Sequence, residues 1–140
     1  MSFSEDRTSE LWREFRTRES KIKNRIGSES YSVKVYRPEY SFAVFDPGKS
    51  FEKWAAAAVG EPDHDFETLE ISSGLYAVFA HIGPAEKAPV AFEHIFEAWL
   101  PNSGFVIDSR PHFEMLPEGY DPFDPTAEEE IWLPIRQRTT

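Results

Sequence analysis

A single carboxylate stands in the middle of an apolar segment near the C-terminal end of the chain. Residues 110–116 (RPHFEML) alternate in a way that predicts a strand, with His112 and Glu114 on one face and Phe113 and Met115 on the other. Glu114 is then either solvated on a wet sheet face or buried in a cavity. A carboxylate taken out of water costs several kcal/mol unless a cation pairs with it, so a buried Glu114 would be suited to bind a cationic group.

Two alternatives for Glu114 follow from its neighbours in the sequence. As a structural residue it would pair with Arg110, Arg136 or a backbone amide. As a ligand-binding residue it would supply the charge that selects a cation, while Trp and Tyr rings would add cation–π attraction of about 0.5–2 kcal/mol each. His112, on the same face, would tune the carboxylate, act as a proton shuttle or cap the strand end.

The sequence contains no other catalytic or metal-binding pattern. There is no cysteine, which excludes disulfides, thiol nucleophiles and cysteine-type zinc sites. No serine has a GxSxG context. Metal-ligand spacing such as HxxxH or HExxH is missing from all the histidines, which are His64, His81, His94 and His112. We therefore expect no metal and no cofactor.

The composition is that of a globular, acidic chain rich in aromatic residues. Its 140 residues favour one domain, residues 1–140, and 15% of them are aromatic, which suits cores and also pockets for flat ligands. The net charge of −10 excludes DNA and RNA as direct partners, because phosphates require clustered cations. No apolar run approaches the roughly 20 residues that span a bilayer, and we expect no signal peptide ahead of the first polar residues. A cytoplasmic location without membrane attachment is expected.

Hydrophobic periodicity predicts two helices and several strands. One helix falls within residues 4–22, and another covers about 89–99, where apolar residues follow Phe92 at i+3, i+4 and i+7. The acidic residues 127–130 are expected to be a solvated turn and strand entry, and Pro134 predicts an edge position or a strand end. The predicted strands are 1–4, 31–37, 51–59, 66–72, 74–82, 105–109, 112–116 and 130–135.

Two segments of the chain resemble each other. Residues 45–54 (FDPGKSFEKW) and 123–132 (FDPTAEEEIW) share Phe, Asp, Pro, Glu and Trp at matching positions. The second segment has strand chemistry, which favours a strand for the alanine-rich residues 51–59 too. Each segment follows a helix and a strand, so we interpret the chain as a strand–helix–strand–strand unit used twice, in halves of about 1–60 and 66–136.

Two such units predict an α+β fold. The expected architecture is an antiparallel sheet with two helices on one face, a pseudo-twofold axis between the halves, and a central pocket. Tyr36 in the first half corresponds, by the same offset, to Glu114 in the second. One half would offer a phenol ring to the pocket and the other a carboxylate. Trp54 and Trp132, which occupy matching positions, would line the pocket or pack in the core.

Four motifs, taken together and in order, resemble the GyrI-like effector-binding domains. Such domains also serve as the ligand domain of AraC-type and MerR-type multidrug-responsive regulators, and occur as stand-alone or integron-cassette proteins. The resemblance is good over residues 74–135 and weaker over 1–60, where the duplicated pattern supports it. The motifs are GLYAVFAHIGP (74–84), AWLPNSGF (98–105), RPHFEML (110–116) and DPTAEEEIWLPI (124–135).

The resemblance implies a central aromatic cavity that meets lipophilic cations. Glu114 matches the acidic residue that faces the cavity in the family, and Trp132 matches an aromatic position in the last strand. Trp99 and Tyr76 are further aromatic residues that could join them. The predicted ligand-binding residues are therefore Glu114, Trp132, Trp99, Tyr76, Tyr36 and Trp54.

The expected function is binding of small lipophilic, in particular cationic, molecules. The protein would be multidrug-sensor-like without a DNA-binding domain of its own, and would act as a sequesterer or as a sensor through a protein partner. Some relatives are similar to small hydrolases of electrophilic toxins, so one alternative is an enzyme that uses Glu114 as general base or nucleophile. A third alternative is an acidic protein-interaction or inhibitor module. The sequence carries no signal for the oligomeric state.

Overall fold

The computed structural model describes Ser2 and residues 6–37 and 48–139. Strands in this part of the chain form one antiparallel sheet in the order β2-β1-β5-β6-β3, with β4 paired to the C-terminal end of β6. The strands are β1 (Ser30–Val35), β2 (Glu52–Ala56), β3 (Tyr76–Ile82), β4 (Phe105–Ile107), β5 (His112–Leu116) and β6 (Glu128–Gln137).

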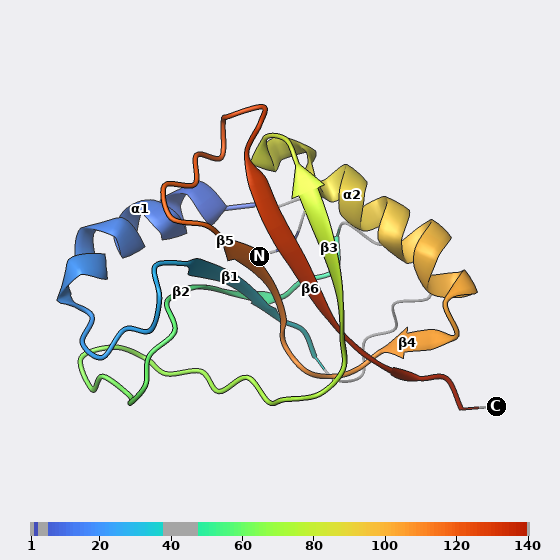
Figure 1. Ribbon diagram of the computed structural model, residues 1–140, viewed down its shortest axis with the longest axis horizontal. Coiled ribbons are helices and arrows are strands. Elements are labelled where there is room, and N and C mark those ends of the chain that lie inside the picture. Colours follow the sequence, from blue (N-terminus) through green and yellow to red (C-terminus); the bar gives the residue numbers. More distant parts are fainter. Residues whose placement is uncertain (1, 3–5, 38–47, 140) are drawn as a thin grey trace.

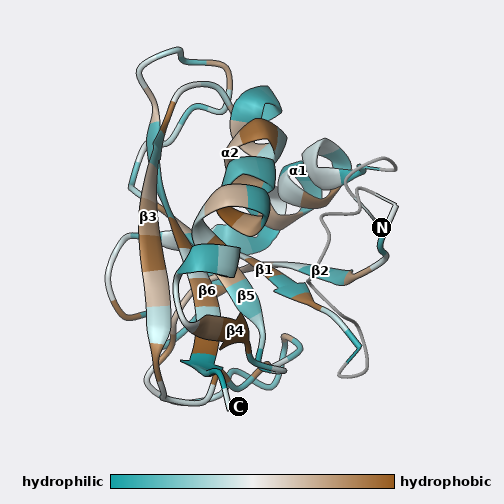
Figure 2. Ribbon diagram, turned by 90° about the vertical axis from the view of Figure 1, so that its right-hand side faces the viewer, coloured by the Kyte–Doolittle hydropathy of each residue, from teal (hydrophilic) through white to brown (hydrophobic). Residues whose placement is uncertain are grey.

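Two helices lie on the same side of the sheet, which we call the helix face (Figure 1). Helix α1 (Thr8–Arg18) ends in a 3-10 turn and contacts β2, while α2 (Ala88–His94) continues through a π turn, Ile95–Trp99, and a 3-10 turn, Leu100–Asn102. Figure 2 shows the two helices stacked against this side of the sheet from another direction. The predicted α+β architecture, with an antiparallel sheet and both helices on one face, is confirmed.

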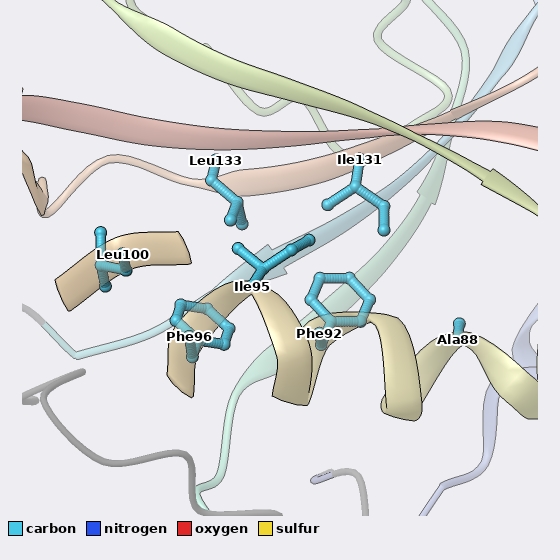
Figure 3. Close-up of a cluster of buried hydrophobic side chains, with 7 residues drawn as sticks. All are labelled: Ala88, Phe92, Ile95, Phe96, Leu100, Ile131 and Leu133. Atoms are coloured by element: carbon cyan, nitrogen blue, oxygen red, sulfur yellow. The ribbon is translucent and has the colours of Figure 1, made fainter. Parts of the chain in front are cut away.

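The core lies between α2 and the middle of β6 (Figure 3). The i, i+3, i+4 pattern that begins at Phe92 brings Phe92, Ile95 and Phe96 onto one side of the helix, where all three are buried. They pack against Ile131 and Leu133 of β6, whose exposed fractions are 1% and 0%. This apolar contact fixes α2 above the strand that also carries part of the candidate site.

The predicted strand at residues 66–72 is wrong. The chain between β2 and β3 makes only a single bridge, between Arg25 and Val59, and then crosses the side of the sheet opposite the helices (Figure 1). Phe66 and Leu69 are half-buried there although they are three residues apart, so the burial of this segment does not follow the alternation of a strand. The alanine-rich segment does form a strand, β2, and the strand predicted at residues 1–4 lies outside the described residues.

Pro134 is not in an edge strand, because β6 lies between β5 and β3. Pairing of β6 with β5 ends at Trp132, two positions before the proline. On the β5 side, Pro134 lies beyond the first residue of β5. There its carbonyl accepts a hydrogen bond from the backbone N–H of Asp108 at 2.9 Å. The missing N–H of proline therefore leaves no gap in the ladder.

Candidate functional site

Strand β5 presents two chemically different faces. His112, Glu114 and Leu116 are buried on the helix face, while Phe113 and Met115 are partly exposed on the other, which we call the far face. This is the alternation that the sequence predicts. Glu114 is 8% exposed, so it is a buried acid rather than a solvated one.

Glu114 is paired with a lysine from the first half of the chain. Lys34 lies on β1 two residues after Ser32, which is the residue directly opposite Glu114. The Nζ atom of Lys34 is 3.0 Å from Glu114 Oε1. Both side chains are buried. Lys34 Nζ also lies 3.9 Å from the centre of the Phe92 ring, so the ammonium group sits between a carboxylate and an aromatic face.

The arginines that the sequence suggested as partners of Glu114 are engaged elsewhere. Arg110 Nε is 2.9 Å from Asp108 Oδ2, and Arg136 Nε is 3.9 Å from the other oxygen of Asp108. The guanidinium of Arg110 also covers the ring of Tyr76 at 4.6 Å. The structural alternative of a paired carboxylate is therefore met by Lys34.

A second buried carboxyl group, Glu129, lies next to Glu114. Glu129 is 4% exposed and shares the helix face with Ile131, the residue opposite Glu114 in β6. The Tyr120 hydroxyl donates a hydrogen bond to Glu129 Oε2 at 3.4 Å, whereas no N–H or O–H donor of the described residues bonds Glu129 Oε1. The Glu114 and Glu129 side chains can share a hydrogen bond if one of them is protonated.

The sequence reasoning missed Glu129 because it treated residues 127–130 as solvated, and only Glu128 and Glu130 are exposed. The signal was available: Glu129 alternates in phase with Ile131 and Leu133, both of which are buried.

The two carboxyl groups have opposite pKa shifts. Burial alone would raise the pKa of Glu114, but the Lys34 and Lys53 ammonium groups outweigh burial and hold the pKa of Glu114 below its usual range. Burial and the adjacent charge of Glu114 raise the pKa of Glu129 to about 9. At neutral pH, Glu114 is thus ionised and Glu129 carries a proton that it can donate to Glu114.

The other titratable groups of the site are shifted by the same surroundings. Burial, and then the charge of Lys34, lowers the pKa of His112 to about 3, so its ring is neutral. Burial and Lys34 lower the pKa of the partly exposed Lys53 to about 8. Burial and the Glu114 charge raise the pKa of Tyr36, whose ring centre is 4.8 Å from that of His112.

The aromatic residues of the far face form a separate cluster. Phe113 and Trp132 stack with ring centres 5.3 Å apart, and Tyr76 meets both rings edge-on at 5.6 and 5.7 Å. Tyr31 contacts Phe113 at 5.9 Å. The Trp132 indole N–H donates a hydrogen bond to Glu130 Oε1, two residues earlier on the same strand.

A groove of about 1100 Å³ adjoins this cluster, between the end of α1, β2 and residues 57–71. Tyr31, Trp54 and Phe113 contribute aromatic surface to it. Most of its charged lining is acidic: Glu14, Glu52, Glu61, Asp63, Asp65, Glu67 and Glu70, against Arg18 and Lys53.

The six predicted ligand-binding residues therefore lie in three places. Glu114 and Tyr36 belong to the helix-face cluster. Trp132, Tyr76 and Trp54 lie on or beside the far face, and the sheet separates them from Glu114. Trp99 packs at the margin of the core, with its ring edge-on to Phe79 at 5.0 Å.

The strand registers change one detail of the internal comparison. Trp54 lies opposite Val33, and Trp132 lies opposite Phe113. If the two tryptophans are matched, Lys34 rather than Tyr36 corresponds to Glu114, because the chain from β1 to Trp54 is two residues longer than the chain from β5 to Trp132. The buried ion pair then joins equivalent positions of the two halves.

Two further classes of site find no support in the described ranges. No group of three or more potential metal ligands occurs in residues 6–37 and 48–139. Over the same ranges, no helix is both long enough and apolar enough to cross a membrane.

An antiparallel sheet with two helices on one face, and a buried acid that holds a cation against an aromatic ring, is an arrangement suited to binding small molecules. The chain belongs to the GyrI-like small molecule binding domain family, whose profile matches residues 1–136. No curated protein matches the chain at a significant level.

Solved structures share the fold at low sequence identity. A candidate bacterial transcription regulation protein from Staphylococcus aureus MU50 superposes with a TM-score of 0.62 and 16% identity, over 92% of this chain and 80% of its own. The protein SAV2435 bound to tetraphenylphosphonium superposes with a TM-score of 0.64 and 15% identity, over 91% of this chain and 76% of its own. At these identities the comparison establishes the fold alone.

Proposed function

We propose that the protein binds lipophilic cations on the helix face, with Glu114 as the charged group and Tyr36 as an aromatic residue that contacts the ligand. The supporting observation is the environment of Lys34. Its ammonium group lies 3.0 Å from Glu114 Oε1 and 3.9 Å from the centre of the Phe92 ring. A carboxylate combined with an aromatic face is the pair of features that recognises an organic cation.

The choice of cation class is also supported by the comparison of structures. SAV2435, which has the same fold, was solved bound to tetraphenylphosphonium, a permanently charged and lipophilic cation. Tetraphenylphosphonium is therefore a suitable probe for this protein. A multidrug-sensor-like role would follow if several unrelated lipophilic cations bind, because aromatic walls and one charge constrain ligand shape only loosely.

An arriving cation competes with Lys34 for Glu114. The lysine side chain is a flexible stem with a compact charge, so it can swing away from Glu114 more readily than an arginine could. The ligand gains the contact with Glu114 and with the Phe92 ring that Lys34 gives up. The measured binding free energy is then the difference between the interaction of Glu114 with the ligand and its interaction with Lys34.

The test is calorimetric titration of tetraphenylphosphonium into the wild-type protein and into Glu114→Gln. The variant should bind at least tenfold more weakly, because the amide keeps the shape of the side chain and loses its charge. Triphenylphosphine oxide, a neutral ligand of related shape, should bind both proteins equally. Glu128→Gln is the matched control, since Glu128 is an exposed carboxylate at the start of the neighbouring strand β6, out of phase with the buried Glu129.

Equal losses for the cation and the neutral ligand would contradict the role of charge at Glu114. An unchanged cation affinity in Glu114→Gln would place the ligand elsewhere, and the acidic, aromatic groove around Trp54 would be the next surface to examine. Circular dichroism of each variant checks that the fold is intact.

A further inference from the structure

Glu129 is a buried acid, and one of its carboxyl oxygens accepts no hydrogen bond from an N–H or O–H donor of the described residues. It is 4% exposed and its Oε2 accepts the Tyr120 hydroxyl, while Oε1 is the oxygen that none of these donors bonds. Its side chain is close enough to Glu114 for a hydrogen bond, which forms only if one of the two acids carries a proton. An unpaired polar atom in such a position is costly, and native proteins keep few of them. The hydrogen-bonding capacity of this oxygen is therefore satisfied either by a proton shared with Glu114 or by a ligand.

The charges around Glu129 come from every neighbouring strand. Lys34 on β1 and Lys53 on β2 are positive, Glu114 on β5 is negative, and His112 on β5 is neutral. His81 on β3 is the residue directly opposite Glu129, and Tyr120 approaches from the loop before β6.

Among the described residues, the charges near Glu129 leave no net negative charge. Lys34 neutralises Glu114, and the charge of Lys53 is opposed by that of Asp6, so with respect to these residues an incoming cation meets a site that is balanced or slightly positive. Two adjacent buried carboxyl groups cannot both ionise cheaply, so the second one stays protonated until another positive charge arrives. Glu129 is the only group in this cluster of described residues that can supply a new negative charge.

We propose that Glu129 couples cation binding to proton release: it holds a proton in the ligand-free protein and releases it when a cationic ligand binds. The O–H bond of Glu129 breaks, the proton passes to the buffer, and the ligand's positive charge takes its place beside the two carboxylates. No other bond changes. This inference rests on the proposed binding of cations at Glu114 and adds the exchange of one proton for one cation.

The exchange makes cation affinity depend on pH. Because Glu129 is protonated up to a pKa of about 9, the affinity for tetraphenylphosphonium should rise about tenfold per pH unit between pH 6 and 8. The probe carries a permanent charge and does not titrate. Lys53, with a pKa of about 8, also loses charge near the upper end of this range. The dependence must therefore be traced to Glu129 by substitution.

The experiment is calorimetric titration of tetraphenylphosphonium at pH 7 in phosphate and in Tris, two buffers whose heats of ionisation differ. We expect about one proton released per cation for the wild type and for the control Glu128→Gln. Glu129→Gln should release none, bind at least tenfold more weakly and show an affinity nearly independent of pH. Glu129→Asp, which retains the acid, should restore the proton release.

Cation binding with no proton release, or with undiminished release in Glu129→Gln, would overturn the exchange while leaving the proposed function intact. If tetraphenylphosphonium does not bind at any pH, the proposed function fails, and a second measurement decides the proton itself. Infrared spectra of the ligand-free protein at pH 7 should contain a protonated carboxylic acid band that Glu129→Gln removes. The absence of that band would overturn the inference independently of any ligand.

Discussion

At the scale of residues, the candidate site consists of four titratable groups, one from each of four strands, on the helix face of the sheet. Lys34 and Glu114 form the ion pair, Glu129 contributes a proton, and Lys53 lies at the margin. Buried ion pairs recover their desolvation cost only when geometry and further hydrogen bonds are good. Such a cluster is therefore expected to contribute little net stability, and under the proposed function its role is to select cations.

The pH dependence of stability isolates Glu129. Its carboxyl group loses its proton near pH 4.5 in the unfolded chain and near pH 9 in the folded one, so the folded protein binds more protons between these values. The free energy of unfolding should therefore fall as pH rises from 6.5 to 8, by at most about 1.4 kcal/mol per pH unit. Urea unfolding of the wild type and of Glu129→Gln at pH 6.5, 7.2 and 8 measures this, and the variant should show the flatter curve.

The chosen window limits the opposite contributions of two neighbours, and the comparison with Glu129→Gln subtracts what remains of them, because both proteins contain His112 and Lys53. His112 titrates near pH 3 when folded and 6.5 when unfolded, which makes stability rise with pH below the window. Lys53 titrates near pH 8 when folded and 10.5 when unfolded, which makes stability rise with pH above it. Equal slopes for the two proteins between pH 6.5 and 8 would mean that Glu129 is ionised in the folded state.

The sequence predicts Glu114 and its face because strand alternation is local information. Lys34 could not be assigned to Glu114 in the same way, because it is 80 residues away in the chain and only the β1–β5 register brings the two together. Glu129 was within reach, since its phase matches that of Ile131. Its position between the exposed Glu128 and Glu130 makes the segment look solvated when judged by composition alone.

At the scale of elements, the contact between α2 and β6 determines where the site lies. Leu133 is fully buried in this contact, two positions after Ile131 and four after Glu129. The helical spacing from Phe92 predicts the buried face of α2 correctly. The end of the helix differs: the π turn at residues 95–99 leaves Trp99 at the margin of the core and brings Leu100 into it.

Leu133→Ala should lower the free energy of unfolding by about 2–5 kcal/mol, because it removes buried methyl groups from a closely packed region. Ile82→Ala on β3 is a matched control in the same sheet, where the side chain is 64% exposed, and should change stability by less than about 0.5 kcal/mol. Thermal or urea unfolding measures both. A small effect of Leu133→Ala would mean that the helix is not anchored through this contact.

The segment between β2 and β3 shows where sequence patterns mislead. Residues 66–72 alternate as a strand does, yet a strand also requires a neighbour with unpaired backbone groups, which the pattern cannot supply. The chain instead crosses the far face and forms one wall of the groove. Phe66 and Leu69 are half-buried and have opposite phases, while Ile71, in phase with Leu69, is exposed, so tertiary context rather than alternation decides which of these residues turn inward.

At the scale of the whole molecule, the sheet divides two environments of different character. The helix face holds the buried charges, and the far face carries the stacked rings of Phe113 and Trp132, while the acidic groove follows the β2 edge of the sheet between α1 and residues 57–71. If the chain consists of two related units with Trp54 and Trp132 equivalent, Lys34 and Glu114 occupy matching positions. In that interpretation the halves share a backbone plan and differ in the sign of one central charge.

The most direct test of the account is the affinity of Lys34→Gln for tetraphenylphosphonium. This variant removes the internal cation and leaves the Glu114 carboxylate for the ligand, so we expect binding at least tenfold tighter than in the wild type, even though the protein itself becomes less stable. Glu114→Gln should change the affinity in the opposite direction. General damage to the fold would weaken binding in both variants. Unchanged or weaker binding in a folded Lys34→Gln protein would contradict the claim that ligand and lysine compete for Glu114.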